Sequence, residues 1–340
     1  MTKILIIYTG GTIGMIQNQD GTLVPFDFAN ITSNVPELSR LNYIIDVHSF
    51  NPILDSSNMN LDVWLNLVSI IEQKYEQYDG FVILHGSDTM AYTASALSFL
   101  IESLNKPIVL TGSQLPIGEI RTDAKENLIT SIEIAASRDY RNKTLIPEVC
   151  IYFDYQLMRG NRAKKVHADK FEAFTSPNYP LLAEAGVNLN FYSENILSEP
   201  ELPVKFYHSL NNKIASIKIF PGISKSFVES IVKANDIDAI IIEGFGTGNT
   251  STEPWFIELL SQASDSGKIL YDISQCLGGT VDIGRYETSK HLEKMGVVSG
   301  YDITFEAAIT KLMFLLANFN EVENIKRLLS INLRGEMKIN

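Results

Sequence analysis

Two short loops of this 340-residue chain combine glycines with hydroxyl groups directly after apolar runs. Residues 9–14 read Thr-Gly-Gly-Thr-Ile-Gly, and residues 85–89 read His-Gly-Ser-Asp-Thr. Glycine lets the backbone approach a ligand closely, and a hydroxyl on such a turn is displayed rather than packed away. These residue types suit acyl transfer, in which a hydroxyl attacks a carbonyl, a base takes its proton and backbone N–H groups stabilise the oxyanion.

Two further loops add charged and small polar groups to this inventory. Residues 55–58 read Asp-Ser-Ser-Asn, and residues 159–165 contain Arg159, Arg162, Lys164 and Lys165. A carboxylate and a lysine are suited to anchoring a charged substrate or to moving a proton. The basic run has a plain alternative, because such clusters often form only a solvated loop face.

The elements that must position these loops follow an α/β pattern. Short apolar runs rich in β-branched and aromatic residues predict strands, and helical spacing between them predicts helices, with Asn60 as the N-cap of the first. The predicted strands are 4–8, 44–50, 80–84, 108–111 and 149–153, and the predicted helices are 61–78, 88 or 89 to 101, and 123–136. Ligands of open α/β sheets bind outside the carboxyl ends of the strands, where all four loops should meet.

The chain exceeds the length that one core usually supports, so two domains are expected. We predict an N-terminal catalytic α/β domain at 1–187 with a mostly parallel sheet and flanking helices, a linker at 188–212, and a smaller C-terminal α/β domain at 213–340. The linker contains prolines and the pair Asn211-Asn212, which predict turns rather than a packed element. The C-terminal domain is predicted to hold strands 214–219, 239–243 and 269–272, and helices 226–234, 254–266, 304–317 and 322–329.

Composition excludes several classes of function. A net charge of −12 repels phosphate backbones, so no nucleic-acid partner is expected. No apolar run approaches the ~20 residues of a membrane span, and Gly10-Gly11 end the first apolar run well short of a signal peptide. Two cysteines, Cys150 and Cys276, suit a reducing cytoplasm and are interpreted as buried thiols. The five histidines lack metal-ligand spacing, so neither a metal nor another cofactor is expected.

Taken singly, each glycine loop is ambiguous. Residues 9–14 could cradle a phosphate, although their spacing is neither G-x-G-x-x-G nor a Walker A motif and no lysine follows the glycines. Residues 85–89 could be a capped helix start, with Ser87 or Asp88 as the cap and no chemistry.

Taken together and in order, the segments resemble the L-asparaginase family, and specifically its cytoplasmic type I branch. The resemblance covers nearly the whole chain. The segments that carry it are 8–14, 55–59, 80–91, 110–114, 159–165, 220–223, 246–249 and 332–336.

The resemblance implies a hydrolase that converts the side-chain amide of L-asparagine to aspartate and ammonia, and a homodimer or homotetramer built from intimate dimers. Thr12 matches the nucleophilic threonine, and Ser87 with Lys165 matches the second hydroxyl and its coupled lysine. The positions that match substrate-binding residues are Asp55, Ser56 and Ser57 for the α-carboxylate, Ser87 and Asp88, the latter for the α-amino group, and Asn249 reaching the site from the neighbouring subunit.

Two departures from the family pattern bear on mechanism, and a further one bears on regulation. Ser87 stands where the family normally has threonine, which keeps the hydroxyl but loses the methyl that restricts χ1. Residues 15–25 contain no tyrosine, and Thr22 or Leu23 stands nearest to the position of the family's lid tyrosine, so no residue is assigned to accept the proton of Thr12. At the regulatory asparagine site of type I relatives, which involves a cysteine matching Cys276, Lys164 and Glu243 do not look like the usual partners.

Lys165 is a candidate base, acting directly or through Ser87, although Asp88 beside it would favour the charged lysine. A Lys165–Asp88 salt bridge that only shapes the pocket is the structural alternative. Ser87 could instead activate the water that hydrolyses the acyl-enzyme. Two rival functions stay open: a non-catalytic amino-acid sensor on the same fold, and a glutamine-deamidating transamidation subunit.

Overall fold

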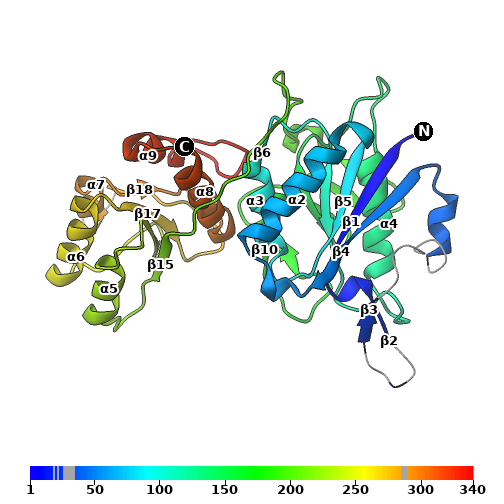
Figure 1. Cartoon of the computed structure of the whole chain (residues 1–340). Helices are drawn as coiled ribbons and strands as arrows, with labels where there is room; N and C mark the ends of the chain where they lie inside the picture. The colour runs from blue at the N-terminus through cyan, green and yellow to red at the C-terminus, as the bar shows by residue number, and fades with distance from the viewer. Residues whose placement is uncertain (18–19, 21–22, 26–34, 285–288, 340) are drawn as a thin grey trace. The chain divides into compact units, whose positions relative to one another are not determined.

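The computed structural model describes residues 1–17, 20, 23–25, 35–284 and 289–339. It divides into two compact units, Met1–His208 and Ser209–Asn340, each with its own sheet (Figure 1). The α/β fold class predicted from the alternating pattern is confirmed.

The first unit contains an eight-stranded sheet in the order β13-β12-β9-β8-β7-β5-β1-β4. The strands from β4 to β8 in this order pair in parallel, and those from β8 to β13 pair antiparallel. Their bounds are β1 (Lys3–Gly10), β4 (Ile44–Leu54), β5 (Gly80–Leu84), β7 (Ile108–Thr111), β8 (Val149–Phe153), β9 (Gln156–Arg159), β12 (Ala183–Ala185) and β13 (Leu189–Phe191). The five strands predicted in this half are therefore present.

Helices cover both faces of this sheet. Figure 1 shows α2 (Leu61–Lys74) and α3 (Met90–Leu100) on one face and α4 (Ala124–Ala136) on the other. The predicted N-cap is confirmed, because Asn60 Oδ1 accepts a hydrogen bond from the N–H of Val63 at 3.2 Å. Along β1 and β5, side chains on both faces of the sheet are buried, as expected for parallel strands that are covered on both sides.

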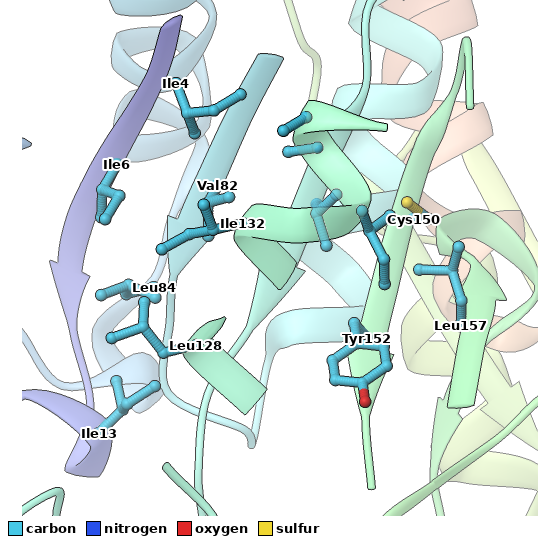
Figure 2. Packing of buried hydrophobic residues seen from close by; sticks show 14 of the residues in the cluster. Ile4, Ile6, Ile13, Val82, Leu84, Leu128, Ile132, Cys150, Tyr152 and Leu157 are labelled. Carbon is cyan, nitrogen blue, oxygen red and sulfur yellow. The ribbon is translucent and has the colours of Figure 1, made fainter. Parts of the chain in front are cut away.

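The core between the sheet and α4 is built from alternate residues of neighbouring strands. Figure 2 shows Ile4 and Ile6 of β1 and Val82 of β5 beside side chains of α4 such as Ile132. All of these side chains are 0% exposed, so the carboxyl ends of the strands project from a rigid layer.

Short elements surround the sheet and carry several loops of interest. The strands are β2 (Met15–Gln17), β3 (Leu23–Pro25), β6 (Ile101–Glu102), β10 (Lys164–Lys165), β11 (Phe174–Thr175) and β14 (Lys205–Phe206). The 3-10 helices are η1 (Thr12–Gly14), η3 (Pro36–Arg40), η4 (Ser56–Asn58), η5 (Tyr75–Gln77), η6 (Gly160–Arg162) and η7 (Ser193–Asn195).

The segment 188–212, predicted as turns without a packed element, contains ordered structure. β13 pairs with β12 at the edge of the large sheet, and β14 pairs with β6. The two units divide between His208 and Ser209, near the end of this segment. The prolines misled the prediction because very short edge strands tolerate neighbouring prolines and carry too few residues to show a period.

The second unit contains a parallel four-stranded sheet in the order β15-β16-β17-β18. Its strands are β15 (Ile214–Lys218), β16 (Ala239–Gly244), β17 (Ile269–Ser274) and β18 (Val298–Ser299). Its helices are α5 (Lys225–Val232), α6 (Pro254–Asp265), α7 (Lys290–Lys294), α8 (Phe305–Asn318) and α9 (Val322–Leu329). All the predicted elements are present, whereas β18 and α7 were not predicted because each is too short to show a period. Among the described residues, no helix has the length and apolar character to cross a membrane.

Candidate functional site

The strand order of the first unit creates a divergence between β1 and β5. After β1 the chain continues to β4 on one side, and after β5 it continues through α3 to β7 on the other side. The loops that follow β1 and β5 therefore leave the sheet in opposite directions. Such a switch point is where open α/β sheets bind ligands, and both glycine loops identified in the sequence begin here.

The turn that carries Thr12 is held tightly against its neighbours. Thr12 opens η1, and the preceding Gly11 has φ 89°, a left-handed conformation that glycine adopts without strain. The hydroxyl of Tyr8 donates to the carbonyl of Gly14 at 3.1 Å and so clamps the far end of the turn. Because Thr12 itself remains partly exposed, its hydroxyl lies on a fixed backbone that a ligand can reach.

Gly11 and Gly86 bring the two glycine loops into direct contact. A β-carbon added to Gly11 would lie 2.5 Å from the backbone nitrogen of Gly86. A β-carbon added to Gly86 would in turn lie 2.6 Å from Oγ of Ser56. Three loops thus meet at Gly86, and glycine at both positions is explained by close backbone approach.

Lys165 connects the second loop to the rest of the site. Its Nζ donates to Oγ of Ser87 at 2.8 Å and to Oδ1 of Asp88 at 2.7 Å. Lys165 lies on β10, which pairs with β11, so its backbone is fixed by a ladder partner. The side chain of Lys165 is 18% exposed and that of Asp88 is 66% exposed, which places the pair at the rim of the protein surface. A proton can pass between Ser87 and Lys165 along a single hydrogen bond.

The capped-helix interpretation of residues 85–89 is wrong. Thr89 occupies the N-cap position of α3, and no side-chain capping bond is made there. Thr89 Oγ1 instead donates to the carbonyl of Ser56 at 2.7 Å, and Ser87 and Asp88 accept from Lys165. The side chains of Ser87, Asp88 and Thr89 are thus bonded to other loops rather than to the helix.

The loop at residues 55–57 supplies an oriented carboxylate. Asp55 Oδ1 accepts hydrogen bonds from the N–H of Ser57 at 2.8 Å and from its hydroxyl at 2.7 Å. These bonds, with the backbone contribution the larger, lower the pKa of the Asp55 carboxyl. Ser56 is buried against Gly86, whereas Asp55 and Ser57 are exposed.

The predicted site residues are therefore brought together in part. The loops of Thr12, Ser56 and Ser87 meet at Gly86, and Asp88 and Lys165 join them through hydrogen bonds. Thr22 lies outside the described residues. Leu23 begins β3. This strand pairs antiparallel with β2, and β2 directly follows η1.

Asn249 belongs to the second unit and lies in the loop that follows β16. The N–H of Phe245 donates to the carbonyl of Asn249 at 2.8 Å, and the N–H of Asn249 donates back to Phe245 at 2.8 Å. The contribution of Asn249 to a site remains a prediction.

The basic run at 159–165 is not a solvated face. Arg159 is 3% exposed and Arg162 is 2% exposed, and Nε of Arg159 forms a buried ion pair with Glu148 at 2.6 Å. The buried-thiol interpretation holds for Cys150 but is wrong for Cys276, which is exposed. In the parts of the chain that the structure describes, no three acidic, cysteine or histidine residues gather as metal ligands would.

The sequence did not reveal the hydrogen bonds of Gln114 and Asp123, which hold the segments next to the candidate site in place. Gln114 Nε2 donates to the carbonyl of Lys170 at 2.7 Å and so ties the segment after Lys165 to the end of β7. Asp123 accepts from the N–H groups of Gln114 and Leu115 at 3.0 and 3.1 Å. The segment 110–114 was recognised as part of a pattern, but nothing in its composition identifies the distant partners.

Comparison with known proteins covers both units. Residues 3–197 match the family described as Asparaginase, N-terminal, and residues 213–329 match the Glutaminase/Asparaginase C-terminal domain. The chain is 39% identical over 337 residues to L-asparaginase 1 of Escherichia coli strain K12, a match that covers 98% of each. It is 31% identical over 337 residues to the L-asparaginase of Thermococcus kodakarensis, over 98% of this chain and 99% of that protein. The crystal structure of L-asparaginase I from Vibrio cholerae superposes with a TM-score of 0.90 at 38% identity, covering 99% of both chains.

Proposed function

The chain belongs to the asparaginase family, and we propose that it hydrolyses the side-chain amide of L-asparagine to L-aspartate and ammonia through an acyl-enzyme on Thr12. The observation that supports this most is the meeting of the Thr12 turn with the Ser87–Asp88–Lys165 cluster at the switch point of the sheet. An amidohydrolase needs a displayed hydroxyl and a proton route, and these loops supply both.

In the acylation step, Oγ1 of Thr12 attacks the carboxamide carbon of the substrate. The new C–O bond forms as the C–N bond breaks, and the hydroxyl proton of Thr12 is finally carried by the leaving ammonia. The hydrogen bond between Ser87 and Lys165 is the route that we assign to this proton. Nζ of Lys165, which also bonds Asp88, passes a proton through Ser87 to the leaving nitrogen and is reprotonated by the proton of Thr12.

In the second step, water cleaves the ester and regenerates Thr12. One proton of the attacking water passes by Lys165 and Ser87 to Oγ1 of Thr12 as the ester bond breaks, and the new aspartyl carboxyl releases the other proton to solvent. The two half-reactions then use one hydrogen bond in opposite directions, which restores the starting protonation state.

Substrate recognition is assigned to the charged groups around this pair. The loop of Asp55, Ser56 and Ser57 receives the α-carboxylate, and the exposed carboxylate of Asp88 accepts from the α-ammonium group. An asparagine side chain is one methylene shorter than glutamine, a difference worth only ~1 to 3 kcal/mol in a pocket, so slower glutamine hydrolysis is expected.

We further propose a homodimer or homotetramer, in which Asn249 of a neighbouring copy completes the site. A cytoplasmic location fits the two cysteines, neither of which forms a disulfide. The net charge of −12 disfavours a nucleic-acid partner.

The test is ammonia release from asparagine and from glutamine, measured in a coupled assay. Thr12→Ala should lower turnover of asparagine by ~10³-fold or more, because the nucleophile is lost. Thr144→Ala is the matched control, since Thr144 precedes β8 and so lies toward the amino ends of the strands. Full turnover by Thr12→Ala would overturn the assignment of the nucleophile.

The rival functions give different results in the same assay. An amino-acid sensor would bind asparagine without releasing ammonia. A transamidation subunit would release ammonia from glutamine in preference to asparagine. Either result would contradict the proposed function.

A further inference from the structure

A buried chain of hydrogen bonds leads from the body of the first unit to the loop of Ser87. His85 follows β5 and is 0% exposed. Its Nδ1 lies 2.7 Å from the carbonyl oxygen of Gly86, and its Nε2 lies 2.8 Å from Oγ1 of Thr93 on α3. Nε1 of Trp64 on α2 lies 2.9 Å from the same Oγ1. One chain of contacts thus joins two helices to the peptide that precedes Ser87.

The chemistry of these groups fixes the direction of every proton. A carbonyl oxygen can only accept, so Nδ1 of His85 must carry a hydrogen. The indole N–H of Trp64 can only donate, so Thr93 accepts from it and can donate its own hydrogen to Nε2. Trp64 therefore donates to Thr93, Thr93 donates to His85, and His85 donates to the carbonyl of Gly86. The imidazole in this arrangement is neutral and in the Nδ1–H form.

Burial keeps the imidazole in that form. It lowers the pKa of His85 to about 4, with the bond to Gly86 opposing the shift only in part. At neutral pH the Nε2 atom is therefore free of hydrogen and can accept from Thr93.

The group at the end of this chain is where three loops meet. Gly86 is in close contact with Gly11, which precedes Thr12, and with Ser56 of the substrate loop. The same peptide is bonded to Ser87, whose hydroxyl accepts from Lys165. A rotation of the Gly86–Ser87 peptide would therefore displace the nucleophile turn and the second hydroxyl together.

We propose that Trp64, Thr93 and His85 act as a positioning relay that holds the Gly86–Ser87 peptide, and through it Ser87 and the turn of Thr12, in the geometry that catalysis requires. This inference rests on the proposed function. The relay matters more with serine at position 87 than it would with threonine, because Ser87 lacks the methyl group that restricts χ1. None of the three side chains needs to touch the substrate.

The substrate loop depends on the relay less than the reacting groups do. Asp55 and Ser57 hold each other, and Thr89 donates to the carbonyl of Ser56, so this loop keeps its own hydrogen bonds when the relay is broken. Loss of the relay should thus lower kcat more than it raises KM.

The experiment compares Thr93→Val with Thr93→Ser. Valine keeps the shape of threonine but cannot bond Trp64 or His85, whereas serine keeps the hydroxyl. Thr93→Val should lower kcat ~10- to 100-fold with KM changed less, because a small displacement of reacting groups is costly. Thr93→Ser should stay within ~3-fold of the unmodified protein. Thr310→Val is the matched control, since Thr310 is a fully buried helical threonine of α8 in the other unit.

A second measurement tests the relay without enzyme activity. Nitrogen-15 NMR of the imidazole rings, with His85 assigned by the loss of its signals in His85→Gln, should show the neutral Nδ1–H form at pH 7. The proposal is overturned if His85 carries its hydrogen on Nε2, or if Thr93→Val keeps full kcat. If the unmodified protein releases no ammonia, the proposed function fails, while the ring measurement still decides whether the relay exists.

Discussion

Two lysine–carboxylate pairs in this chain have almost the same length and opposite surroundings. In the first unit, Lys165 lies 2.7 Å from Asp88, with side chains 18% and 66% exposed. In the second unit, Lys311 lies 2.6 Å from Glu336, and both side chains are 0% exposed. Distance alone therefore does not reveal what an ion pair does.

The difference lies in what else each lysine touches. Lys165 bonds the hydroxyl of Ser87, a group that can take part in chemistry. Lys311 on α8 donates to the backbone carbonyls of Leu329 and Ile331 and so holds the C-terminal segment against α8, within the second unit. Burial opposes ionisation of Glu336, but Lys311 and two backbone N–H groups outweigh it, so the pKa of Glu336 is lowered. The exposed pair suits proton transfer, and the buried pair suits structure.

The variant Lys165→Met tests most strongly whether the two lysine–carboxylate pairs differ in role. This change should lower asparagine turnover by ~10²- to 10⁴-fold, because the proton route is lost. The free energy of unfolding should change by less than about 1 kcal/mol, since exposed pairs contribute little. Turnover and denaturant unfolding measure the two effects, with Lys233→Met of the exposed Lys233–Glu229 pair as the control. Retained turnover would reduce Lys165–Asp88 to a salt bridge that shapes the pocket.

The converse change is Lys311→Met. It should lower the free energy of unfolding by ~3 to 5 kcal/mol, because the Glu336 charge is left buried without its partner. Urea unfolding measures this loss, and the folded fraction should keep its kcat. Lys311→Met combined with Glu336→Leu should recover much of the stability, since a matched apolar pair has no charge to desolvate. An equally unstable double variant would contradict this account of the buried pair.

Much of this architecture was predictable from sequence, because its elements are long and periodic. The central strands and the main helices were assigned from runs such as 80–84 and 108–111, whose bounds the structure reproduces. Short elements such as β13 and β18 were missed, since two or three residues show no period. Their formation depends on an existing sheet edge, which local sequence does not encode.

The meeting of the loops that form the candidate site was predictable to a similar extent, whereas the roles of their residues stay predictions. Glycine loops after strands pointed to Thr12 and Ser87, and the structure brings their loops together at Gly86. The supporting bonds of Thr93 and Trp64 could not be foreseen, because they join helices that are separated in sequence by β5. The burial of Arg159 was also hidden, since its partner Glu148 precedes a different strand.

The first unit also contains a buried titratable group, His85, which should make the stability of this unit depend on pH. The pKa of His85 is lowered from 6.5 to about 4 in the folded protein. The unfolded chain therefore binds a proton between these values while the folded protein does not. Stability is fully present above pH 6.5 and is lost as the pH falls toward 4, by ~3 kcal/mol in all.

Denaturant unfolding across this pH range measures the effect. The slope should be smaller in His85→Gln, which does not titrate, than in the unmodified protein. His48→Gln is the control, because His48 is an edge-strand histidine on β4 outside the relay. Equal slopes in the unmodified protein and His85→Gln would show that His85 is not buried as a neutral ring.

The smallest expected effect concerns the methyl group that Ser87 lacks. Ser87→Thr should raise kcat by about two- to five-fold, because a restricted χ1 holds the hydroxyl near Lys165 more of the time. Steady-state kinetics with asparagine checks this change, and stability should be unaffected. A fall in kcat would show that the pocket of this chain is fitted to serine.

Intact-protein and peptide mass spectrometry of acid-quenched reactions can locate the acyl group, which we propose is carried by Thr12. During turnover of asparagine, the mass of the peptide that contains Thr12 should increase by one aspartyl group, and this increase should be absent in Thr12→Ala. An aspartyl group found on the peptide of Ser87, or a modified peptide that persists in Thr12→Ala, would contradict this proposal.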